Sequence, residues 1–296
     1  MALINTGGII IGIKSAGEMA SGVAVRLYRA GFTKIFMMEI PHPLAVRRTV
    51  SFCEAVHDQN AAVEGIESVL CGNKEAVFTA WKKGRIPVVV DPFWKYLSIL
   101  RPSVLVDAVI AKKNLGTAMK DAPLVIGLGP GFTAGKDVHR VIETMRGHHL
   151  GRVIEKGSAM PNTGIPGAIG GHTLARVLRA PADGVFHSKH SIMDRIMAGE
   201  VVGEVGGQTI VSEIDGVLRG LIREGSLVRK GVKIGDIDPR GDTGYCHIVS
   251  DKARALGGAV LEAVMGGAEY LEEAETLRRN LMECGPEAAL ARAYML

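Results

Sequence analysis

The feature that most constrains the fold of this chain is an internal repeat in residues 181–238. The segment that begins at Pro181 aligns with the one that begins at Glu213 at a constant offset of 32 residues. The matched residues are Asp183 with Asp215, Gly184 with Gly216, Val185 with Val217, Gly199 with Gly231 and Gly203 with Gly235. Each half has the pattern of three strands joined by two glycine turns, and neither half could bury its apolar face alone. We therefore expect the two halves to close on each other as a small β-barrel.

The repeat resembles the biotinyl/lipoyl hammerhead, a small flattened barrel with quasi-twofold symmetry. In carrier domains of that family, the modified lysine lies at the tip of the hairpin that joins the halves. The corresponding hairpin here runs from Glu204 to Thr209, and the chain has no lysine between Lys189 and Lys230. The resemblance therefore implies a structural or docking module that carries no covalent biotin or lipoate.

The first 150 residues alternate short, apolar, β-branched runs with amphipathic segments, which is typical of a parallel α/β sheet. The expected strands are Gly8–Ile13, Lys34–Glu39, Pro87–Val90, Val104–Val109 and Leu124–Leu128. The expected helices are Glu18–Arg29, Lys74–Lys83 and Ala134–Arg146. The sequence thus predicts an α/β fold with a Rossmann-like domain at 1–150, a Gly/Pro-rich linker at 151–180, the hammerhead β-barrel at 181–240 and C-terminal helices at 241–296.

Two helices are expected after the barrel. The first runs from Asp251 to Met265, with Ser250 as its N-cap. The second runs from Ala268 to about Met282 and has a charged pattern that usually faces solvent.

Composition and charge exclude several classes of protein. The chain has 296 residues, with 35 Lys and Arg against 31 Asp and Glu, and the two signs are interleaved, so we expect no nucleic-acid partner. Cys53, Cys71, Cys246 and Cys284 lack C-x-x-C spacing, which favours a reducing compartment. Neither a signal peptide nor a membrane span is expected, which predicts a cytoplasmic protein with no membrane partner. A homo-oligomer stays open.

A first glycine loop follows the first expected strand and opens a helix. A Rossmann turn uses glycines so that backbone N–H groups can approach a pyrophosphate at a helix N-terminus. Here the loop contains Lys14, Ser15, Gly17 and Glu18, and Glu39 ends the next strand at the spacing of an acid that binds ribose. The loop is a candidate nucleotide site; the alternative is a glycine-packed turn with a surface glutamate.

A second glycine loop contains Gly127, Gly129, Gly131, Thr133 and Gly135 and is expected to lead into a helix. It lacks the Lys-Ser/Thr pair of a Walker A loop, so we interpret it as a backbone nest for an anion or as a tight turn. Because both loops follow parallel strands, we expect them to share the carboxyl edge of the sheet and to bind a small anionic ligand. We also expect a valine at position 129 to block that ligand and leave the fold largely intact.

Polar residues after other strands are weaker candidates. Asp107 and Lys112, with Lys113 and Asn114 beside it, follow the strand that should neighbour the second loop, so they can reach the same edge as catalytic or anion-binding groups. The alternative is the solvated start of a helix. Arg47 and Arg48 are candidate anion contacts or surface charges.

Two further groups have side chains suited to chemistry. Cys246 beside His247 could be a nucleophile, although adjacent residues of a strand point to opposite faces, and the alternative is a core cysteine. His187 and His190 lie three residues apart without a nearby Cys or Glu in the sequence, so we expect no metal site there.

Several motifs taken together resemble the YqeB-type accessory proteins of selenium-dependent molybdenum hydroxylases. They are KSAGEMASGVAVRLYRAGF, MEIPHPLAVRRTVSFCEAV, VLVDAVIAKKNLGT, VIGLGPGFTAGKDVHRVIETMRGHHLGRVI and IGDIDPRGD…SDKARALGG, together with the barrel. The likeness runs over nearly the whole chain. It implies a maturation factor whose client protein is a molybdenum hydroxylase, and whose ligand is a nucleotide or a precursor of the molybdenum cofactor. The family's first loop usually reads K-G-A-G-D, from which Ser15 and Glu18 depart.

Two other functions stay open. A nicotinamide-dependent oxidoreductase would need a first loop better suited to pyrophosphate, and a non-catalytic scaffold would use the barrel to dock a partner. The chain is not expected to be a hydroxylase itself, because its four scattered cysteines lack the spacing that iron–sulfur clusters require.

Overall fold

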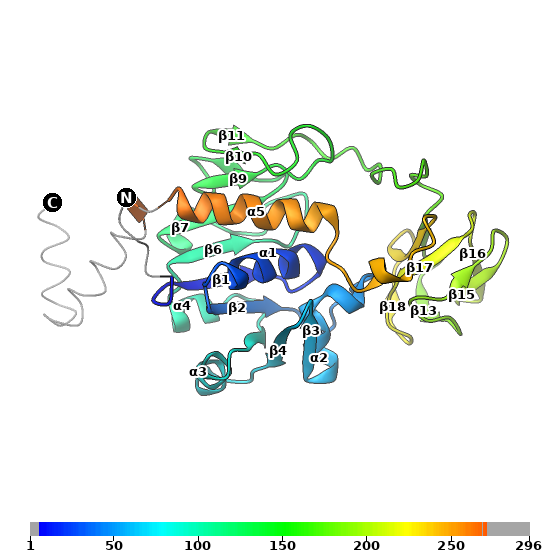
Figure 1. Ribbon diagram of the computed structural model, residues 1–296, viewed down its shortest axis with the longest axis horizontal. Helices are drawn as coiled ribbons and strands as arrows, with labels where there is room; N and C mark the ends of the chain where they lie inside the picture. The colour runs from blue at the N-terminus through cyan, green and yellow to red at the C-terminus, as the bar shows by residue number, and fades with distance from the viewer. Residues whose placement is uncertain (1–5, 268, 271–296) are drawn as a thin grey trace, which may run out of the picture.

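The computed structural model describes residues 6–267, 269 and 270, in which a nine-stranded sheet lies beside two small antiparallel sheets (Figure 1). In spatial order the large sheet consists of β10 (Val153–Ile154), β9 (Arg140–Ile142), β7 (Leu124–Leu128), β6 (Val104–Asp107), β1 (Ile10–Lys14), β2 (Lys34–Glu39), β5 (Ile86–Val90), β4 (Ile66–Leu70) and β3 (Asn60–Val63). Strands β9 through β4 run parallel, and the two edge strands β10 and β3 run antiparallel to their neighbours. The fold is therefore mixed α/β.

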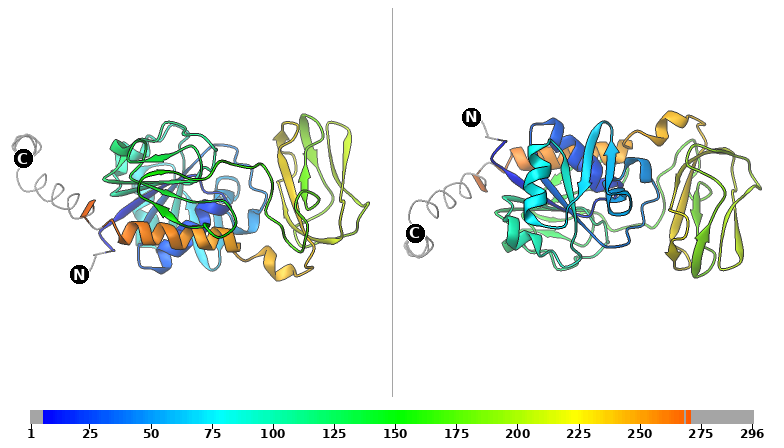
Figure 2. Two further views of the ribbon diagram at one scale, coloured as in Figure 1. Left: turned by 90° about the horizontal axis from the view of Figure 1, so that it is seen from above. Right: turned by 90° about the horizontal axis from the view of Figure 1, so that it is seen from below.

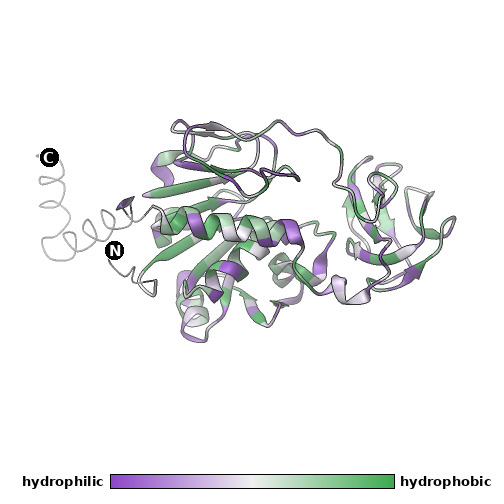
Figure 3. Ribbon diagram, turned by 45° about the horizontal axis from the view of Figure 1, so that its top comes forward, coloured by the Kyte–Doolittle hydropathy of each residue, from purple (hydrophilic) through white to green (hydrophobic). Residues whose placement is uncertain are grey.

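Helices cover both faces of the large sheet. Helices α1 (Glu18–Arg29) and α5 (Asp251–Met265) lie on one face, and α3 (Lys74–Lys82) and α4 (Tyr96–Leu100) lie on the other. Strand residues alternate between the two hydrophobic clusters, as in β2, where Met37 faces α1 and Met38 faces the opposite layer. Figure 3 shows that hydrophobic residues gather in the strands of this sheet. The shorter elements are α2 (Ala55–Asp58), η1 (Arg48–Val50), η2 (Phe52–Glu54), η3 (Met119–Asp121) and η4 (Thr243–Cys246).

The last described helix returns to the first part of the chain. α5 packs along α1, and their backbones approach closely where Gly22 faces Gly257. A Cβ at Gly257 would lie 2.8 Å from the Gly22 carbonyl oxygen, so this crossing requires glycine. Figure 2 shows the same helix lying along the large sheet after the chain has passed through the small sheets. The predicted start of α5 is confirmed, since Ser250 Oγ accepts from the Ala253 N–H at 3.3 Å.

The repeat forms the two small sheets. One contains β12 (Val177–Arg179), β19 (Lys233–Asp238), β17 (Gly216–Leu221) and β14 (Arg195–Ile196), and the other contains β16 (Gln208–Val211), β15 (Val201–Val205), β13 (Gly184–His187) and β18 (Leu227–Val228). Strands β13, β14 and β15 of the first half begin 32 residues before β17, β18 and β19. The short middle strand of each half pairs with the first strand of the other half, so the halves close on each other as predicted.

One predicted helix is wrong. Residues 134–146 do not form a helix: Thr133–Ala134 is strand β8, which pairs with β11 (Gly157–Ser158), and β9 follows within the same segment. Val141 and Ile142 are fully buried in the large sheet, where β9 extends the parallel pairing of β7. Tertiary pairing of these β-branched residues outweighs the local helical pattern.

The β3–β4 hairpin is an element that sequence reasoning missed. Its turn consists of Glu64 and Gly65, which both have positive φ, at 47° and 84°. Such a turn matches the twist of a hairpin, and the E-G dipeptide between alternating residues was the available signal. The second C-terminal helix, expected from Ala268 to Met282, lies almost wholly outside the described residues.

In the part of the chain that the structure describes, none of the helices combines the length and apolar character needed to cross a membrane.

Candidate functional site

The order of the strands reverses between β1 and β6. From β1 the chain builds the sheet in one direction through β2 and β5, and it then returns to the other side of β1 to add β6, β7 and β9. In open α/β sheets, ligands bind at the carboxyl ends of the strands beside such a reversal. Here Lys14 and Asp107 are the last residues of β1 and β6, and they lie opposite each other in the register. We take this edge as the candidate site.

Lys14 is the most deeply buried charge at this edge, with 1% of its side chain exposed. Its Nζ donates to Thr117 Oγ1 at 2.6 Å, and Thr117 Oγ1 donates to Asp107 Oδ2 at 2.5 Å. Asp121 Oδ2 lies 3.8 Å from Nζ, and the centre of the Trp94 ring lies 4.9 Å from it. Burial lowers the pKa of Lys14, while Asp107 and Asp121 act in the opposite direction. The chain Lys14–Thr117–Asp107 can therefore hold or relay a proton at the end of two central strands.

Four residues other than glycine have a positive φ at this edge. They are Ser15 at 80°, Trp94 at 60°, Ile110 at 57° and Lys112 at 62°. They follow β1, β5 and β6, and a β-branched residue such as Ile110 rarely adopts this conformation. Backbone strain of this kind costs about 1–3 kcal/mol per residue and gathers at functional sites. The strain therefore marks the same edge as the strand reversal.

The first glycine loop is held by Glu39. Its Oε2 accepts from the Ala16 N–H at 2.8 Å and from Ser15 Oγ at 3.3 Å, and its Oε1 accepts from the Ile40 N–H at 2.8 Å. Ser15 Oγ in turn accepts from the Gly17 N–H at 3.2 Å. Both oxygens of Glu39 thus bind the chain itself, and the carboxylate shapes the loop.

Glu18 and Arg47 connect the first loop to the junction with the small sheets. Glu18 Oε1 lies 2.9 Å from Arg47 Nη1, so this carboxylate pairs with an arginine and not with Lys14. Arg47 is buried and donates to the carbonyl oxygens of Tyr245 at 2.6 Å and Ile248 at 2.9 Å. Arg48 Nε donates to the Leu221 carbonyl oxygen at 2.9 Å. Both arginines therefore connect the segment after β2 to other parts of the chain: Arg47 to the segment before α5, and Arg48 to the end of β17.

The second glycine loop shares the carboxyl edge, as expected, but no helix follows it. Gly129 and Gly131 have φ of 83° and 108°. A Cβ at Gly129 would lie 2.6 Å from Thr144 Oγ1, and one at Gly131 would lie 2.6 Å from the Lys113 backbone. These glycines therefore allow close packing between the loops after β6, β7 and β9. The expected helix N-terminus at this loop is absent from the described fold.

The remaining residues of this loop have other partners. The ring of Phe132 lies against Gly127, where a Cβ would lie 2.6 Å from it. Thr133 and Gly135 lie in β8 and the turn after it, and Thr133 Oγ1 is 3.0 Å from Ser158 Oγ.

Sequence reasoning missed four residues of the site: Asp91, Trp94, Thr117 and Asp121. Asp91 follows β5 directly and its Oδ2 accepts from the Tyr96 N–H at 2.7 Å. The position of Asp91 after an apolar strand was a usable signal. No local pattern links Thr117 or Asp121 to Lys14.

Cys246 lies in the core. Burial raises the pKa of its thiol, and its Sγ lies 4.0 Å from the Leu218 carbonyl oxygen. His247 Nε2 instead lies 3.1 Å from Met193 Sδ. The structure therefore gives the Cys246 thiol no imidazole partner among the described residues.

His187 and His190 line a cavity of about 600 Å³ on the small sheets. His187 Nδ1 lies 2.7 Å from Glu224 Oε1, a neighbour that the sequence did not reveal. His190 Nδ1 lies 3.4 Å from Asp194 Oδ2. Within the described chain, no group of His, Cys, Asp or Glu has the arrangement of a metal site.

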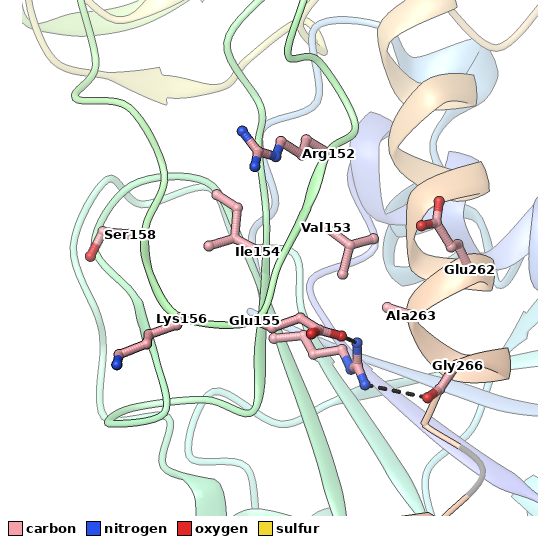
Figure 4. A pocket seen from close by; sticks show the side chains of 10 residues that line it. Arg152, Val153, Ile154, Glu155, Lys156, Ser158, Glu262, Ala263 and Gly266 are labelled. Carbon is pink, nitrogen blue, oxygen red and sulfur yellow. Dashed lines mark hydrogen bonds and ion pairs between the residues drawn. The ribbon is translucent and has the colours of Figure 1, made fainter.

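A cavity of about 690 Å³ lies far from the strand reversal, between β10 and the end of α5. Figure 4 shows its lining, in which Arg140 pairs with Glu155 and donates to the Gly266 carbonyl oxygen. The lining also contains Arg152, Lys156 and Glu262, so it mixes both signs of charge.

Comparison of the sequence with those of known proteins finds a similar protein. The chain is 50% identical over 256 residues to the Escherichia coli (strain K12) protein described as "Uncharacterized protein YqeB". This chain is similar to YqeB. The match covers 86% of this chain and 47% of YqeB, so the chain spans about half the length of this relative. The name of YqeB states no activity, ligand or partner. No protein-family model matches the chain.

Two solved structures align with much of the chain at low similarity. The crystal structure of an aspartoacylase family protein from Mesorhizobium loti has 12% identity and a TM-score of 0.25, and the match covers 78% of this chain and 85% of that chain. The product-bound structure of the ectoine utilization protein EutE (DoeB) from Ruegeria pomeroyi has 9% identity and a TM-score of 0.21, with 77% and 56% covered. Likeness at this level carries no argument about activity.

Proposed function

We propose that this protein is an accessory factor that holds a small anionic ligand while a selenium-dependent molybdenum hydroxylase receives its molybdenum cofactor. The observation that carries the proposal is the meeting of three motifs at one edge. KSAGE at 14–18, VDAVIAKKN at 106–114 and GLGPG at 127–131 all belong to the resemblance, and all follow adjacent parallel strands beside the reversal. The 50% identity to YqeB supports the link to that family.

The ligand that we propose is a nucleotide or a precursor of the molybdenum cofactor. A Rossmann-like interpretation of the large sheet supports it, because parallel strands with helices on both faces bring such ligands to a strand reversal. The cysteine usage favours a reducing compartment, so we place this role in the cytoplasm.

We interpret the repeat as a hammerhead barrel that docks on the client. Its central hairpin joins β15 to β16 through Gly206 and Gly207, where a carrier would have lysine. Large apolar side chains are exposed on this unit, with Leu227 at 75% and Met197 at 62%. Such exposed apolar side chains are available to contact a partner.

A nicotinamide-dependent oxidoreductase is less well supported. Both carboxylate oxygens of Glu39 accept hydrogen bonds from the chain, so the acid at the ribose-binding position is already engaged. Ser15 also replaces the glycine that a pyrophosphate turn would use at this φ of 80°.

The test is deletion of the gene, followed by measurement of the activity and the abundance of the hydroxylase. We expect the client polypeptide to be present at normal abundance and inactive, and the gene on a plasmid to restore activity. A deletion strain whose hydroxylase has full activity would contradict the proposal.

A further inference from the structure

A cavity of about 460 Å³ opens where β6, β7 and β9 end. Its walls come from the loops after these strands, from residues 160–167 of the segment between the sheets, and from the first turn of α5. Lys112, Arg146 and Lys252 line it, and none of its described lining residues is acidic. The cavity is therefore cationic, and it lies at the same edge as the strand reversal.

Two of the three cations, Lys112 and Lys252, form no close ion pair with the described residues. Arg146 is neutralised by Asp251, with Nη1 2.5 Å from Oδ2 and Nη2 2.9 Å from Oδ1. Lys112 has a neutral partner, since the Asn162 amide in its satisfied orientation accepts from Lys112 Nζ at 3.2 Å. The side chain of Lys252 forms no hydrogen bond or ion pair with the residues that the structure describes.

The surroundings of Lys252 disfavour the charged form of its side chain. Burial, and then the charge of Arg146, lower the pKa of Lys252, while Glu18, Glu143 and Asp251 act in the opposite direction. An anion beside Nζ would offset both effects. Lys252 is the second residue of α5, whose N-terminal end carries the positive end of the helix dipole.

The walls of the cavity are fixed by hydrogen bonds that involve no ligand. Glu143 is buried, and its Oε1 accepts from the Met145 N–H at 2.7 Å while its Oε2 accepts from the Met160 N–H at 2.8 Å. This carboxylate joins the end of β9 to the segment that closes the cavity. A site whose walls are already ordered loses less conformational entropy when it binds a ligand.

We propose that this cavity binds a phosphorylated small molecule, with the phosphate between Lys112 and Lys252 and the apolar part against Met145, Met160 and Ile165. Lysine ammonium groups bind phosphate as point charges, and cavities of about 300–1,000 Å³ accept small organic ligands. The inference rests on the proposed ligand-holding function and adds to it a place and a chemical class.

The test is calorimetric titration of the full chain with AMP and with pyrophosphate at constant ionic strength. K112Q and K252Q should each weaken binding of AMP by about tenfold, because each removes one of two unpaired charges. K252R should keep binding within about threefold of the unchanged protein. Lys136 is exposed and lies outside the cavity, so K136Q is the matched control and should bind AMP normally. Adenosine, which lacks the phosphate, should bind at least tenfold more weakly than AMP.

Three results would overturn this proposal. They are equal AMP affinity in K112Q, K252Q and K136Q, no binding of AMP or pyrophosphate at millimolar concentration, and citrate binding as tightly as AMP with the same dependence on the two lysines, which would assign the cavity to carboxylates. Thermal unfolding of each variant without ligand checks that it is folded.

The site and the proposed function can fail separately. If AMP binding depends on the two lysines but the hydroxylase is fully active in the deletion strain, the proposed function is contradicted and the site is supported. An inactive hydroxylase without AMP or pyrophosphate binding would contradict the site alone.

Discussion

Lys14 Nζ donates a 2.6 Å hydrogen bond to Thr117 Oγ1, although 103 residues separate the two along the chain. The contact exists because β1 and β6 lie side by side in the sheet, and Thr117 belongs to the segment that follows β6. Thr117 Oγ1 in turn donates to Asp107 Oδ2, so this hydroxyl connects the buried ammonium to a carboxylate that balances its charge. The geometry makes Lys14 part of the fold as well as part of the candidate site.

Replacing Lys14 by Met should therefore destabilise the protein. Methionine fills a similar volume but leaves Asp107 and Asp121 without their cation, and breaking a buried charged network of this kind costs about 3–5 kcal/mol. Urea denaturation measures the loss in the free energy of unfolding. Lys120 is exposed on the neighbouring segment, so K120M is the control and should change little. Equal stabilities of K14M and K120M would show that the network contributes nothing.

Position 15 should prefer glycine to alanine. Ser15 has a φ of 80°, which costs free energy for any side chain, and its Oγ offsets part of that cost by bonding Glu39 and Gly17. S15A keeps the strain and loses the bonds, whereas S15G removes the strain. We expect S15A to be less stable than S15G by about 1 kcal/mol in thermal or urea unfolding. A more stable S15A would mean that the backbone is unstrained there.

A valine at position 129 should disrupt the fold, in contrast to the expectation from sequence. Gly129 has a φ of 83°, and its Cβ would lie 2.6 Å from Thr144 Oγ1. We expect G129V to lower the free energy of unfolding by more than about 2 kcal/mol. Gly135 has a similar φ of 82° but open space around it, so G135A isolates the backbone cost and should lose about 1 kcal/mol. Similar losses in the two variants would rule out the packing explanation.

Acid should weaken the small sheets through Asp236. Burial alone would raise its pKa, but Lys233, Arg219 and Arg176 outweigh burial and lower the pKa to about 2. An acid with a depressed pKa stabilises the fold fully above its ordinary value of 3.8, and this stabilisation is lost as the pH falls toward about 2. The whole contribution is about 2 kcal/mol, of which about 1 kcal/mol disappears between pH 5 and pH 3.

The measurement is the free energy of unfolding of D236N and of the unchanged protein across that pH range. Between pH 5 and pH 3, the free energy of unfolding of D236N should fall by about 1 kcal/mol less than that of the unchanged protein. The exposed control E213Q should lose as much as the unchanged protein. Parallel curves for D236N and the unchanged protein would show that Asp236 titrates normally in the folded state.

Sequence reasoning succeeded where the pattern is local. The bounds expected for β2 and β7 are those of the structure, because continuous apolar runs mark strands that are buried on both faces. The strands of the small sheets repeat at the 32-residue offset read from the sequence, and the two halves pair as expected because each needs the other to cover its apolar face. The prediction of a helix at residues 134–146 was wrong, because pairing with β7 decides the conformation of β9.

The candidate site was predictable in its place but not in its contacts. Parallel strands put Lys14, Asp107 and the glycine loops at one edge, which the alternation of strands and helices already implied. The partners of each charge come from distant segments, such as Arg47 for Glu18, and no spacing in the sequence encodes such pairs. Glu39 has the spacing of a ribose-binding acid, yet its oxygens close the loop instead.

The proposed function of this protein is to equip a hydroxylase with its cofactor. The most direct measurement is the molybdenum content per polypeptide of the hydroxylase, purified from a deletion strain and from the same strain that carries the gene on a plasmid. We predict a clearly substoichiometric molybdenum or molybdopterin content in the deletion strain and a full content in the complemented strain. Equal and full contents in the two strains would contradict the account.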